Sequence, residues 1–256
     1  MTPRLQDGSE YGMVQWKGTR LHQEDAVDVV TVSGGGFLVL VADGMGGHLA
    51  GEVASRETLA SFSEAFAGYP DMAPPARLSQ ALKDANRHLA SLQKGSQRGN
   101  MGTTLVVAYV DAGNNLYWLS VGDSHLYLWR SGERPRKLNA DHSMWPLVRE
   151  EWLRGDVSLD YALSQRSILR SAVMGEKIDL IDCPGEAFPL QKGDFLLVAS
   201  DGLDEWLEDV DTNKELALSL YPETKNPEAF VHYILEQVEM LEYPYQDNLT
   251  IVGVRI

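Results

Sequence analysis

Two apolar runs of strand length end in the same pair of residues, an aspartate followed by a glycine. The first run covers residues 37–42 and leads directly into Asp43 and a glycine-rich turn. The second covers residues 195–199 and leads through one serine into Asp201 and a glycine. A short run that is apolar at every position is typical of a strand buried on both faces. The sequence therefore predicts two buried strands, each with an acid poised at its end.

Further acids have the same placement at the ends of predicted strands. Glu24 and Asp25 precede one run, Asp123 follows another, and Asp247 precedes the run that closes the chain. Gathered carboxylates repel one another and raise each other's pKa, so such a cluster needs a positive partner. Because no histidines or cysteines cluster with these acids, the oxygen ligands favour Mg²⁺ or Mn²⁺ over zinc or copper. This chemistry points to phosphate.

Hydrophobic periodicity predicts an α+β order of elements: strands, two helices, more strands, then one helix and one strand. Asn226 and the proline after it predict the N-cap and first turn of the last helix. Residues 93–101 and 111–115 have the composition of turns, and the second of these predicts a hairpin. The predicted strands are residues 11–16, 27–32, 37–42, 103–110, 116–121, 125–129, 195–199 and 249–256, and apolar stripes over residues 59–66, 78–92 and 230–241 predict the helices.

Length, charge and cysteine content limit the classes of function. The 256 residues suit one sizeable domain. A formal net charge of −15 argues against nucleic acid and against an anionic membrane surface as partners. The single cysteine, Cys183, forms no internal disulfide, which is compatible with a reducing compartment. The first residues lack the features of a signal peptide, and no apolar run approaches the roughly 20 residues that span a bilayer. We expect a cytoplasmic protein.

Seven short segments carry a resemblance to a known family. They are residues 20–25, 42–48, 102–104, 121–124, 141–143, 199–202 and 247–250. In this order they resemble the metal-dependent protein phosphatases, also called type 2C or PPM Ser/Thr phosphatases, in their compact bacterial form. A single Asp-Gly pair would have almost no weight, whereas seven ordered matches over nearly the whole chain are a strong signal.

The resemblance implies a fold and an activity. The fold is a four-layer α-β-β-α sandwich, in which two antiparallel sheets pack face to face and the acids meet in a cleft at one edge. A single phosphatase domain is expected over residues 1–256, with a flap beside the site at about residues 144–170. The implied reaction is hydrolysis of phosphoserine and phosphothreonine in proteins, reversing a bacterial Ser/Thr kinase. The partners are then phosphorylated proteins, and the enzyme is expected to be a monomer.

The resemblance also implies a binuclear Mn²⁺ or Mg²⁺ centre with a weaker third ion. Asp43 bridges the two ions, and the carbonyl of Gly44 binds one of them, because glycine allows a close backbone approach. Asp201 and Asp247 complete the shell of the first ion. The alternative for Asp43 or Asp247, taken alone, is an ordinary turn aspartate.

The remaining site residues follow from the same resemblance. Glu24 and Asp25 serve the second ion, directly or through water, and Asp123 with Asp201 can hold the third ion. Arg20 is the expected phosphate clamp, because its planar fork offers donors in a fixed geometry. A water activated at the two ions attacks phosphorus in line, and no phosphoenzyme is needed. The alternatives are solvated charges for Glu24, Asp25 and Arg20, and a structural role for Asp123.

The chain departs from parts of the family pattern. Eukaryotic relatives carry a histidine, proposed as the general acid, where this chain has Met45, as bacterial members do. His48 lies three residues further on, where it either replaces that acid or packs at a helix start. Gln23 stands where asparagine is common, and His125 stands where the family usually has arginine. These changes leave the acidic ligands intact but leave the general acid and the substrate contacts open.

Other interpretations remain at this point. A hydrolase of small phosphate esters would share every ligand and differ only in the cleft and flap. A phosphatase-like module that only senses or binds would have lost metal-binding aspartates, and none is missing. Trp145 and Trp152, at near-helical spacing in the predicted flap, indicate a substrate-docking flap, ordinary helical packing, or a protein contact surface.

Overall fold

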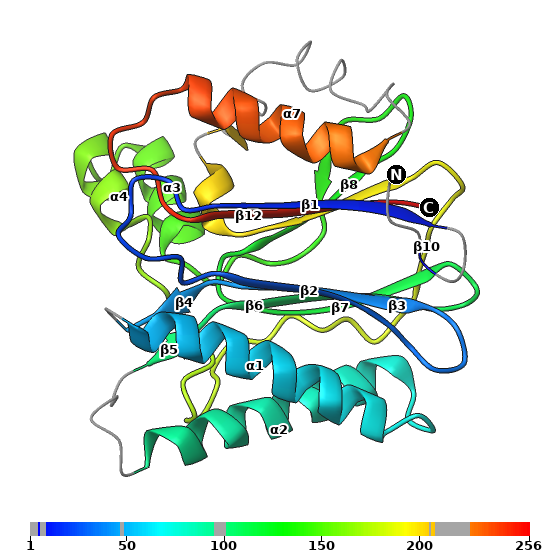
Figure 1. Cartoon of the computed structure of the whole chain (residues 1–256). Coiled ribbons are helices and arrows are strands. Elements are labelled where there is room, and N and C mark those ends of the chain that lie inside the picture. The colour runs from blue at the N-terminus through cyan, green and yellow to red at the C-terminus, as the bar shows by residue number, and fades with distance from the viewer. Residues whose placement is uncertain (1–4, 6–8, 47–48, 95–100, 205, 208–225) are drawn as a thin grey trace.

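The computed structural model describes residues 5, 9–46, 49–94, 101–204, 206–207 and 226–256. Two five-stranded antiparallel sheets form the centre of this part of the molecule (Figure 1). The first sheet contains, in order, β1 (Glu10–Trp16), β12 (Leu249–Arg255), β11 (Phe195–Ala199), β8 (His125–Trp129) and β9 (Arg136–Lys137). The second contains β10 (Phe188–Pro189), β7 (Asn115–Val121), β6 (Leu105–Val110), β3 (Phe37–Ala42) and β2 (Ala26–Thr31). A separate short pair joins β4 (Gly44–Met45) to β5 (Gly102–Thr103).

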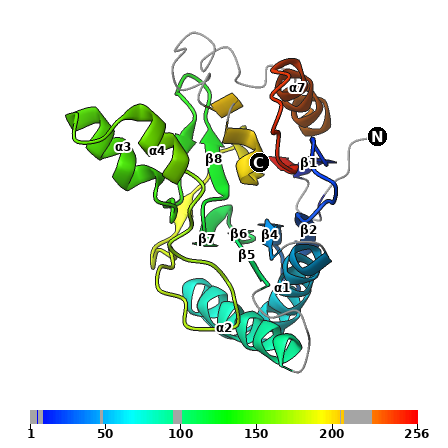
Figure 2. The same ribbon diagram turned by 90° about the vertical axis from the view of Figure 1, so that its left-hand side faces the viewer.

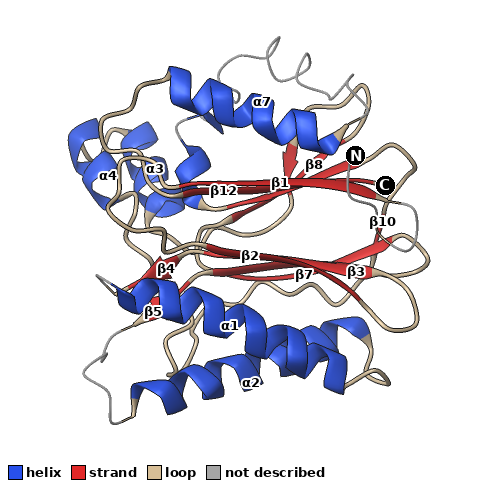
Figure 3. Ribbon diagram, viewed as in Figure 1, coloured by secondary structure: helices blue, strands red, loops and turns tan. Residues whose placement is uncertain are grey.

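Helices cover the outer faces of the two sheets (Figure 3). The helices α1 (Leu49–Gly68) and α2 (Pro74–Gln93) pack on the second sheet, and α7 (Pro227–Met240) packs on the first. Two further helices, α3 (Trp145–Arg154) and α4 (Leu159–Gln165), lie at one end of the sandwich. The four-layer α-β-β-α prediction is therefore confirmed. None of the helices in the described ranges combines the length and the apolar composition needed to cross a membrane.

The strand β3 is covered on one face by helices and on the other face by the first sheet. Its side chains alternate between the two faces of the sheet, as in any strand. Leu38 and Leu40 lie in the core beneath α1 and α2, whereas Phe37, Val39 and Val41 lie in the core between the two sheets. All of these residues are at most 1% exposed. A strand with both faces covered tolerates no polar position, which explains the continuous apolar run.

Two local signals in the sequence are confirmed by their hydrogen bonds. The side chain of Asn226 accepts hydrogen bonds from the backbone N–H groups of Glu228 and Ala229, and so caps α7. The Asp111 carboxylate accepts hydrogen bonds from the N–H groups of Gly113 and Asn115 in the turn between β6 and β7. In both cases the side chain accepts hydrogen bonds from backbone N–H groups within four residues. Such local contacts can be predicted from the sequence.

The predicted continuous strand over residues 103–110 is wrong at its start. It divides into β5 and β6, because the N–H of Thr104 donates to the carbonyl of Asp43 at 2.8 Å. Thr103 instead exchanges backbone hydrogen bonds with Val173. The predicted turn over residues 93–101 lies mostly outside the described residues. The two-residue strands β9 and β10 have too few residues to produce a periodic pattern.

Strand register carries the acidic residues to one end of the sandwich. In the second sheet the first residue of β2 pairs with the last residue of β3, so the Glu24 and Asp25 side lies beside Asp43. In the first sheet the last residue of β11 pairs with a residue near the start of β12, which brings Asp201 to the same end as Asp247. Antiparallel order alone therefore gathers acids that are far apart in sequence.

A buried ion pair in the first sheet gives a test of the fold. Arg130, just after β8, forms a two-pronged ion pair of 2.7 and 2.8 Å with Asp194, just before β11. The Asp194 side chain is only 2% exposed, so Arg130→Ala leaves a buried carboxylate without its cation. We expect the free energy of unfolding to fall by about 2–3 kcal/mol, since the arginine itself is partly exposed.

Urea denaturation measures this change. The matched control is Arg56→Ala, which removes an exposed helix-surface pair with Glu52 and should leave the urea midpoint nearly unchanged. Equal midpoints for the two variants would contradict the assignment.

Candidate metal centre

The end of the sandwich that carries the acids is hollowed into a pocket of about 930 Å³. Figure 2 views the molecule from this end, with α3 and α4 to one side of the ends of the two sheets. The walls come from loops at the ends of both sheets and from the segment after α4. The predicted site residues that line the pocket are Arg20, Glu24, Asp43, Gly44, Asp123, Asp201 and Asp247.

Asp43 is fixed in the pocket through its backbone. Its N–H donates to the hydroxyl of Thr104 at 2.9 Å, and its carbonyl accepts from the hydroxyl of Thr103 at 2.8 Å. Gly44 follows in close contact with the start of α1, where a Cβ atom would lie 2.1 Å from the carbonyl oxygen of Gly51. Only glycine fits at this position. The backbone geometry thus accounts for the Asp-Gly pair that the sequence repeats.

Asp201 and Asp247 come from neighbouring strand ends of the first sheet. Asp201 opens the short 3₁₀ helix η1 (Asp201–Leu203) directly after β11, and its Oδ1 atom is buried without a hydrogen-bond partner. Asp247 precedes β12, and it accepts a hydrogen bond from the N–H of Asn248 at 2.7 Å. Its other oxygen lies 2.5 Å from Arg20.

The adjacent pair Glu24 and Asp25 divides into two different environments. Glu24 lines the pocket, whereas Asp25 is buried behind it, at 6% exposure. One oxygen of Asp25 accepts hydrogen bonds from the hydroxyls of Ser200 and Thr250, both at 2.8 Å. The other oxygen, Oδ1, is buried without a partner. Of the two acids, Glu24 is the one that faces the pocket.

Burial and mutual repulsion disturb the pKa values of these acids. Burial raises the pKa of Asp43 well above its ordinary value, and the charges of Asp201 and Asp25 raise it further. Burial and the charge of Asp123 raise the pKa of Asp201 in the same way. Burial raises the pKa of Asp25 to about 6, although the Thr250 and Ser200 hydroxyls oppose the shift. The charged forms are therefore costly in this pocket.

Asp123 belongs to the same electrostatic group. It lies in the short loop between β7 and β8 and is 8% exposed. Burial raises its pKa to about 7, with further contributions from the charges of Asp204 and Asp141. Asp123 is thus placed beside Asp201, as the third-ion prediction requires, while its role as a ligand stays a prediction.

The donor set fits divalent cations of the Mg²⁺ and Mn²⁺ type. Two buried carboxylate oxygens, on Asp25 and Asp201, lack any partner within the described part of the protein. A buried anionic oxygen is strongly unfavourable without a cation or donor. In the same part, no three acidic, histidine or cysteine side chains are already drawn tightly enough together to form a ready-made ligand shell. The acids therefore bring carboxylate oxygens to one pocket, but they do not form a complete ligand shell in advance.

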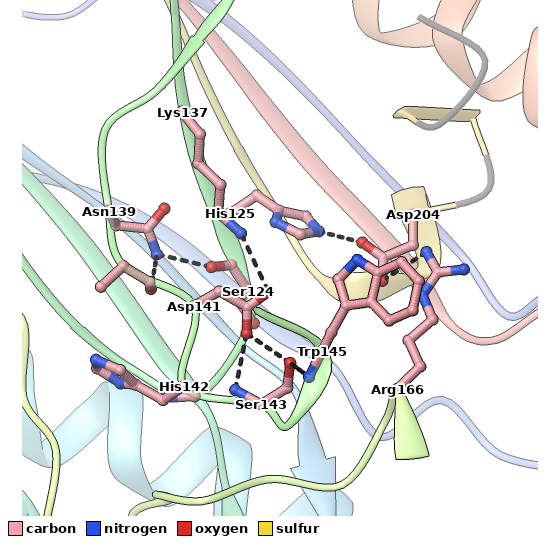
Figure 4. A network of polar contacts seen from close by, with 12 residues as sticks. Ser124, His125, Lys137, Asn139, Asp141, His142, Ser143, Trp145, Arg166 and Asp204 are labelled. Atoms are coloured by element: carbon pink, nitrogen blue, oxygen red, sulfur yellow. Dashed lines mark hydrogen bonds and ion pairs between the residues drawn. The ribbon is translucent and has the colours of Figure 1, made fainter. Parts of the chain in front are cut away.

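Several residues outside the predicted set also belong to this region (Figure 4). Asp204, one turn after Asp201, accepts from Nε2 of His125 at 2.6 Å and lies 3.2 Å from Arg166. Burial lowers the pKa of His125. Its Nδ1 atom is buried and unpartnered, which fits the tautomer that carries the proton on Nε2. Burial tends to raise the pKa of Asp204, but His125 and Arg166 hold it below its ordinary value.

The structure places two histidines differently from the sequence-based predictions. His22, which has no role in the sequence-based prediction, lines the pocket together with Met45. His48 lies outside the described residues. His125, predicted to affect substrate contacts, is 4% exposed and does not line the pocket. The sequence did not indicate that His125 is buried, because its hydrogen-bond partner Asp204 is distant in sequence.

Comparison with known proteins identifies the family. A family model described as Protein phosphatase 2C matches residues 18–249. The chain belongs to the protein phosphatase 2C family. The serine/threonine protein phosphatase PstP of Mycobacterium tuberculosis is 34% identical over 193 residues, which is 74% of this chain and 35% of PstP. This 2C-family chain thus spans about a third of the length of that relative.

Two further comparisons, one with another relative and one with the catalytic domain of PstP, cover nearly the whole of both chains. The serine/threonine phosphatase stp of Listeria monocytogenes is 29% identical over 240 residues, covering 91% of this chain and 90% of the relative. The catalytic domain of PstP, solved in complex with two manganese ions, superimposes with a TM-score of 0.73 at 27% identity. The superposition covers 96% of this chain and 97% of that domain. The family resemblance and the fold are confirmed, whereas the individual ligand roles stay predictions.

The raised pKa values of this 2C-family site predict a pH dependence of stability. Asp25 and Asp123 titrate near 6 and 7 in the folded protein, above the ordinary 3.8, so the folded state binds their protons more tightly. Their contribution to stability is complete at low pH and is lost as the pH rises from about 4 to about 7. We expect the Tm of chelator-treated protein to fall over this range.

Thermal denaturation of Asp123→Asn at several pH values checks this expectation. The variant lacks one of the titrating groups, so its Tm should fall less between about pH 5 and pH 8 than that of the parent. Asp71→Asn, which changes an exposed acid outside the pocket, should keep the slope of the parent. Identical slopes in both variants would contradict the assignment of the titration to the pocket.

Proposed function

We propose that this chain is a metal-dependent protein phosphatase that hydrolyses phosphoserine and phosphothreonine in proteins. The observation that carries the proposal is the convergence of acids from both sheets on one pocket, with buried carboxylate oxygens on Asp25 and Asp201 that lack a partner. Membership of the 2C family supports the same reaction. The relative PstP binds two manganese ions in its catalytic domain, which supports Mn²⁺ or Mg²⁺ for this chain.

The residues that would hold the ions are acids with distinct positions. Asp43 and the Gly44 carbonyl occupy the centre of the predicted set, Asp201 and Asp247 come from the first sheet, and Glu24 comes from the second. Asp25 would act from behind Glu24 and Asp123 would serve a weaker third ion, and both are buried. Bound Mn²⁺ or Mg²⁺ would supply Lewis acidity and make a nucleophilic water available near neutral pH.

Arg20 is the cation that the protein itself offers to a phosphate. Its guanidinium lies at the pocket beside Asp247, and its side chain is 57% exposed. One nitrogen contacts Asp247, and the planar fork has further N–H donors for phosphate oxygens. The contact with Asp247 orients the guanidinium before the substrate arrives. Arg20 thus binds the phosphate and favours the negative charge that develops on its oxygens.

The cellular role follows from the proposed reaction. The partners would be phosphorylated proteins, and the enzyme would reverse a bacterial Ser/Thr kinase in signalling. The enzyme would work in the cytoplasm, and the net charge of −15 supports the absence of nucleic-acid and anionic-membrane partners. A single domain that acts as a monomer fits the continuous sandwich over the described residues.

We expect Asp201→Asn to abolish turnover while the protein stays folded. The change removes one charge from the predicted ligand set, so the loss of kcat should be at least about 100-fold. The measurement is phosphate release from a phosphothreonine peptide and from p-nitrophenyl phosphate, with chelator-stripped protein and added Mn²⁺ or Mg²⁺. The exposed control Asp71→Asn should keep the activity of the parent.

The same assay separates the alternatives. Metal-restored release from the peptide that is lost in Asp201→Asn supports the phosphatase, whereas release from p-nitrophenyl phosphate alone indicates a hydrolase of small esters. Parent protein that binds metal and releases no phosphate from either substrate would indicate a sensing module and overturn the proposal.

Arg20→Ala should weaken substrate engagement. Because the guanidinium makes charge-assisted hydrogen bonds to phosphate, we expect KM for a phosphothreonine peptide to rise about 10-fold or more. Arg20→Lys keeps the charge but lacks the fork and should recover only part of the loss. Arg56→Ala, on the outer helix α1, is the control. Kinetic constants of Arg20→Ala that match those of the control would remove Arg20 from the site.

A further inference from the structure

Gln246, the residue before Asp247, is a buried amide beside the predicted ligands and is only 3% exposed. Its Nε2 atom donates to the carbonyl of Gly202 at 2.8 Å and to the carbonyl of Asp247 at 3.3 Å. Gly202 directly follows Asp201 in η1. One side-chain amide therefore joins the backbone next to one predicted ligand to the backbone of another.

The two carbonyls determine which end of the Gln246 amide faces them. A carbonyl oxygen can only accept hydrogen bonds, so the NH₂ group faces both carbonyls, and a reversed amide would bring three oxygens together. The Oε1 atom at the other end is buried without a partner among the described residues. A buried acceptor without a partner lowers stability. An apolar side chain would therefore pack better at position 246, and the donor group is the part of glutamine that this position uses.

The two strand ends that the amide joins lie in close contact and carry like charges. A Cβ atom on Gly202 would lie 2.1 Å from the carbonyl oxygen of Asn248. Burial raises the pKa of Asp201, and the charge of Asp247 is among those that raise it further. Repulsion between the two carboxylates thus opposes the contact between their backbones. A neutral donor shared by the two backbones resists this repulsion without pairing with either carboxylate.

The backbone of Gln246 also supports the segment that carries Arg20. The N–H and the hydroxyl of Thr19 both donate to the carbonyl of Gln246, at 3.0 and 3.1 Å. Gly18 has a left-handed φ of 61°, and a Cβ atom there would lie 2.4 Å from the carbonyl oxygen of Asp247. The segment after β1 and the segment before β12 lie at the same end of the sandwich (Figure 1). The Arg20 segment is therefore attached to the backbone of position 246 and does not depend on its side chain.

We propose that Gln246 is a positioning residue whose amide holds Asp201 and Asp247 at the spacing that a divalent cation requires. This inference rests on the proposed function, because the cation is the cofactor of that reaction. The amide acts through the backbone of the two acidic segments and is not itself a ligand. Loss of its donor group should therefore weaken metal binding, whereas the Arg20 segment stays attached through the carbonyl of residue 246.

The direct test is the Kd of Mn²⁺, measured by titration calorimetry with chelator-stripped protein. Gln246→Met keeps the length of the side chain and loses both donated hydrogen bonds. We expect its Kd to rise about 10-fold, at the lower end of the effect typical of residues that orient metal ligands. The control is Gln191→Met, which changes an exposed residue in the loop before β11, at the other end of that strand from Asp201. The control should keep the Kd of the parent.

Stability gives a readout that separates positioning from packing. Gln246→Met loses two hydrogen bonds but also removes the buried Oε1 atom that has no partner among the described residues. These effects oppose each other, so the urea midpoint should stay close to that of the parent. Gln246→Asn keeps the amide on a shorter side chain, and its Kd should lie between those of the parent and Gln246→Met. If Gln246→Met cannot be purified, Gln246→Asn must show a raised Kd by itself.

Activity gives a third readout. The Mn²⁺ concentration for half-maximal activity of Gln246→Met should rise about 10-fold, by the same factor for a phosphothreonine peptide and for p-nitrophenyl phosphate. At saturating Mn²⁺ the KM for each substrate should stay close to that of the parent, because Arg20 keeps its place. This pattern differs from that expected for Arg20→Ala, in which KM itself rises.

The outcomes separate the two levels of proposal. A Kd of Gln246→Met equal to that of Gln191→Met would overturn the positioning role. A Kd that rises only together with a large fall in the urea midpoint would overturn it as well, because a general loosening of the fold would then explain the loss. Parent protein that binds Mn²⁺ and releases no phosphate from any substrate would overturn the proposed function instead, and the comparison of Kd values would still decide on Gln246.

Discussion

The arrangement of the molecule depends on the repulsion among carboxylates that the two sheets force into one pocket. Burial raises the pKa of Asp43 well above its ordinary value, and the charge of Asp201 adds to the shift; burial and the charge of Asp123 raise the pKa of Asp201. No short segment of chain would hold these acids together, because their charged forms favour water and separation. The apolar strands behind them supply the compensating stability, since β3 and β11 are buried at every position. The large apolar core therefore offsets the unfavourable free energy of the acid cluster.

Neutral groups, together with the Arg20 cation that contacts Asp247, hold the acids in position. The hydroxyls of Ser200 and Thr250 in the first sheet bind one oxygen of Asp25, which begins the edge of the second sheet. The side-chain oxygen of Asn248 accepts a hydrogen bond from the backbone N–H of Glu24 at 2.7 Å. Such contacts fix geometry without neutralising charge. These contacts also join the two sheets at the site itself.

The sequence predicted those features whose physical cause is local. Continuous apolar runs identified β3 and β11, and Asn226 marked the start of α7, because each signal lies within a few residues. The break at Thr104 was not predictable, since it results from a hydrogen bond to Asp43, which is far away in sequence. The burial of Asp25 beside the pocket-facing Glu24 depends in the same way on Ser200 and Thr250, which are far away in sequence. Motif order identified the site, but only the fold shows how its parts are held.

The departure at His125 has a structural meaning that the sequence alone did not give. The family usually has an arginine there, and the sequence comparison suggested an effect on substrate contacts. In the structure the ring is buried and donates to Asp204, which also binds Arg166 of the 144–170 segment. His125 and the Arg166 guanidinium thus share one carboxylate next to the acid cluster, and the residue at position 125 belongs to this buried contact rather than to the lining of the pocket.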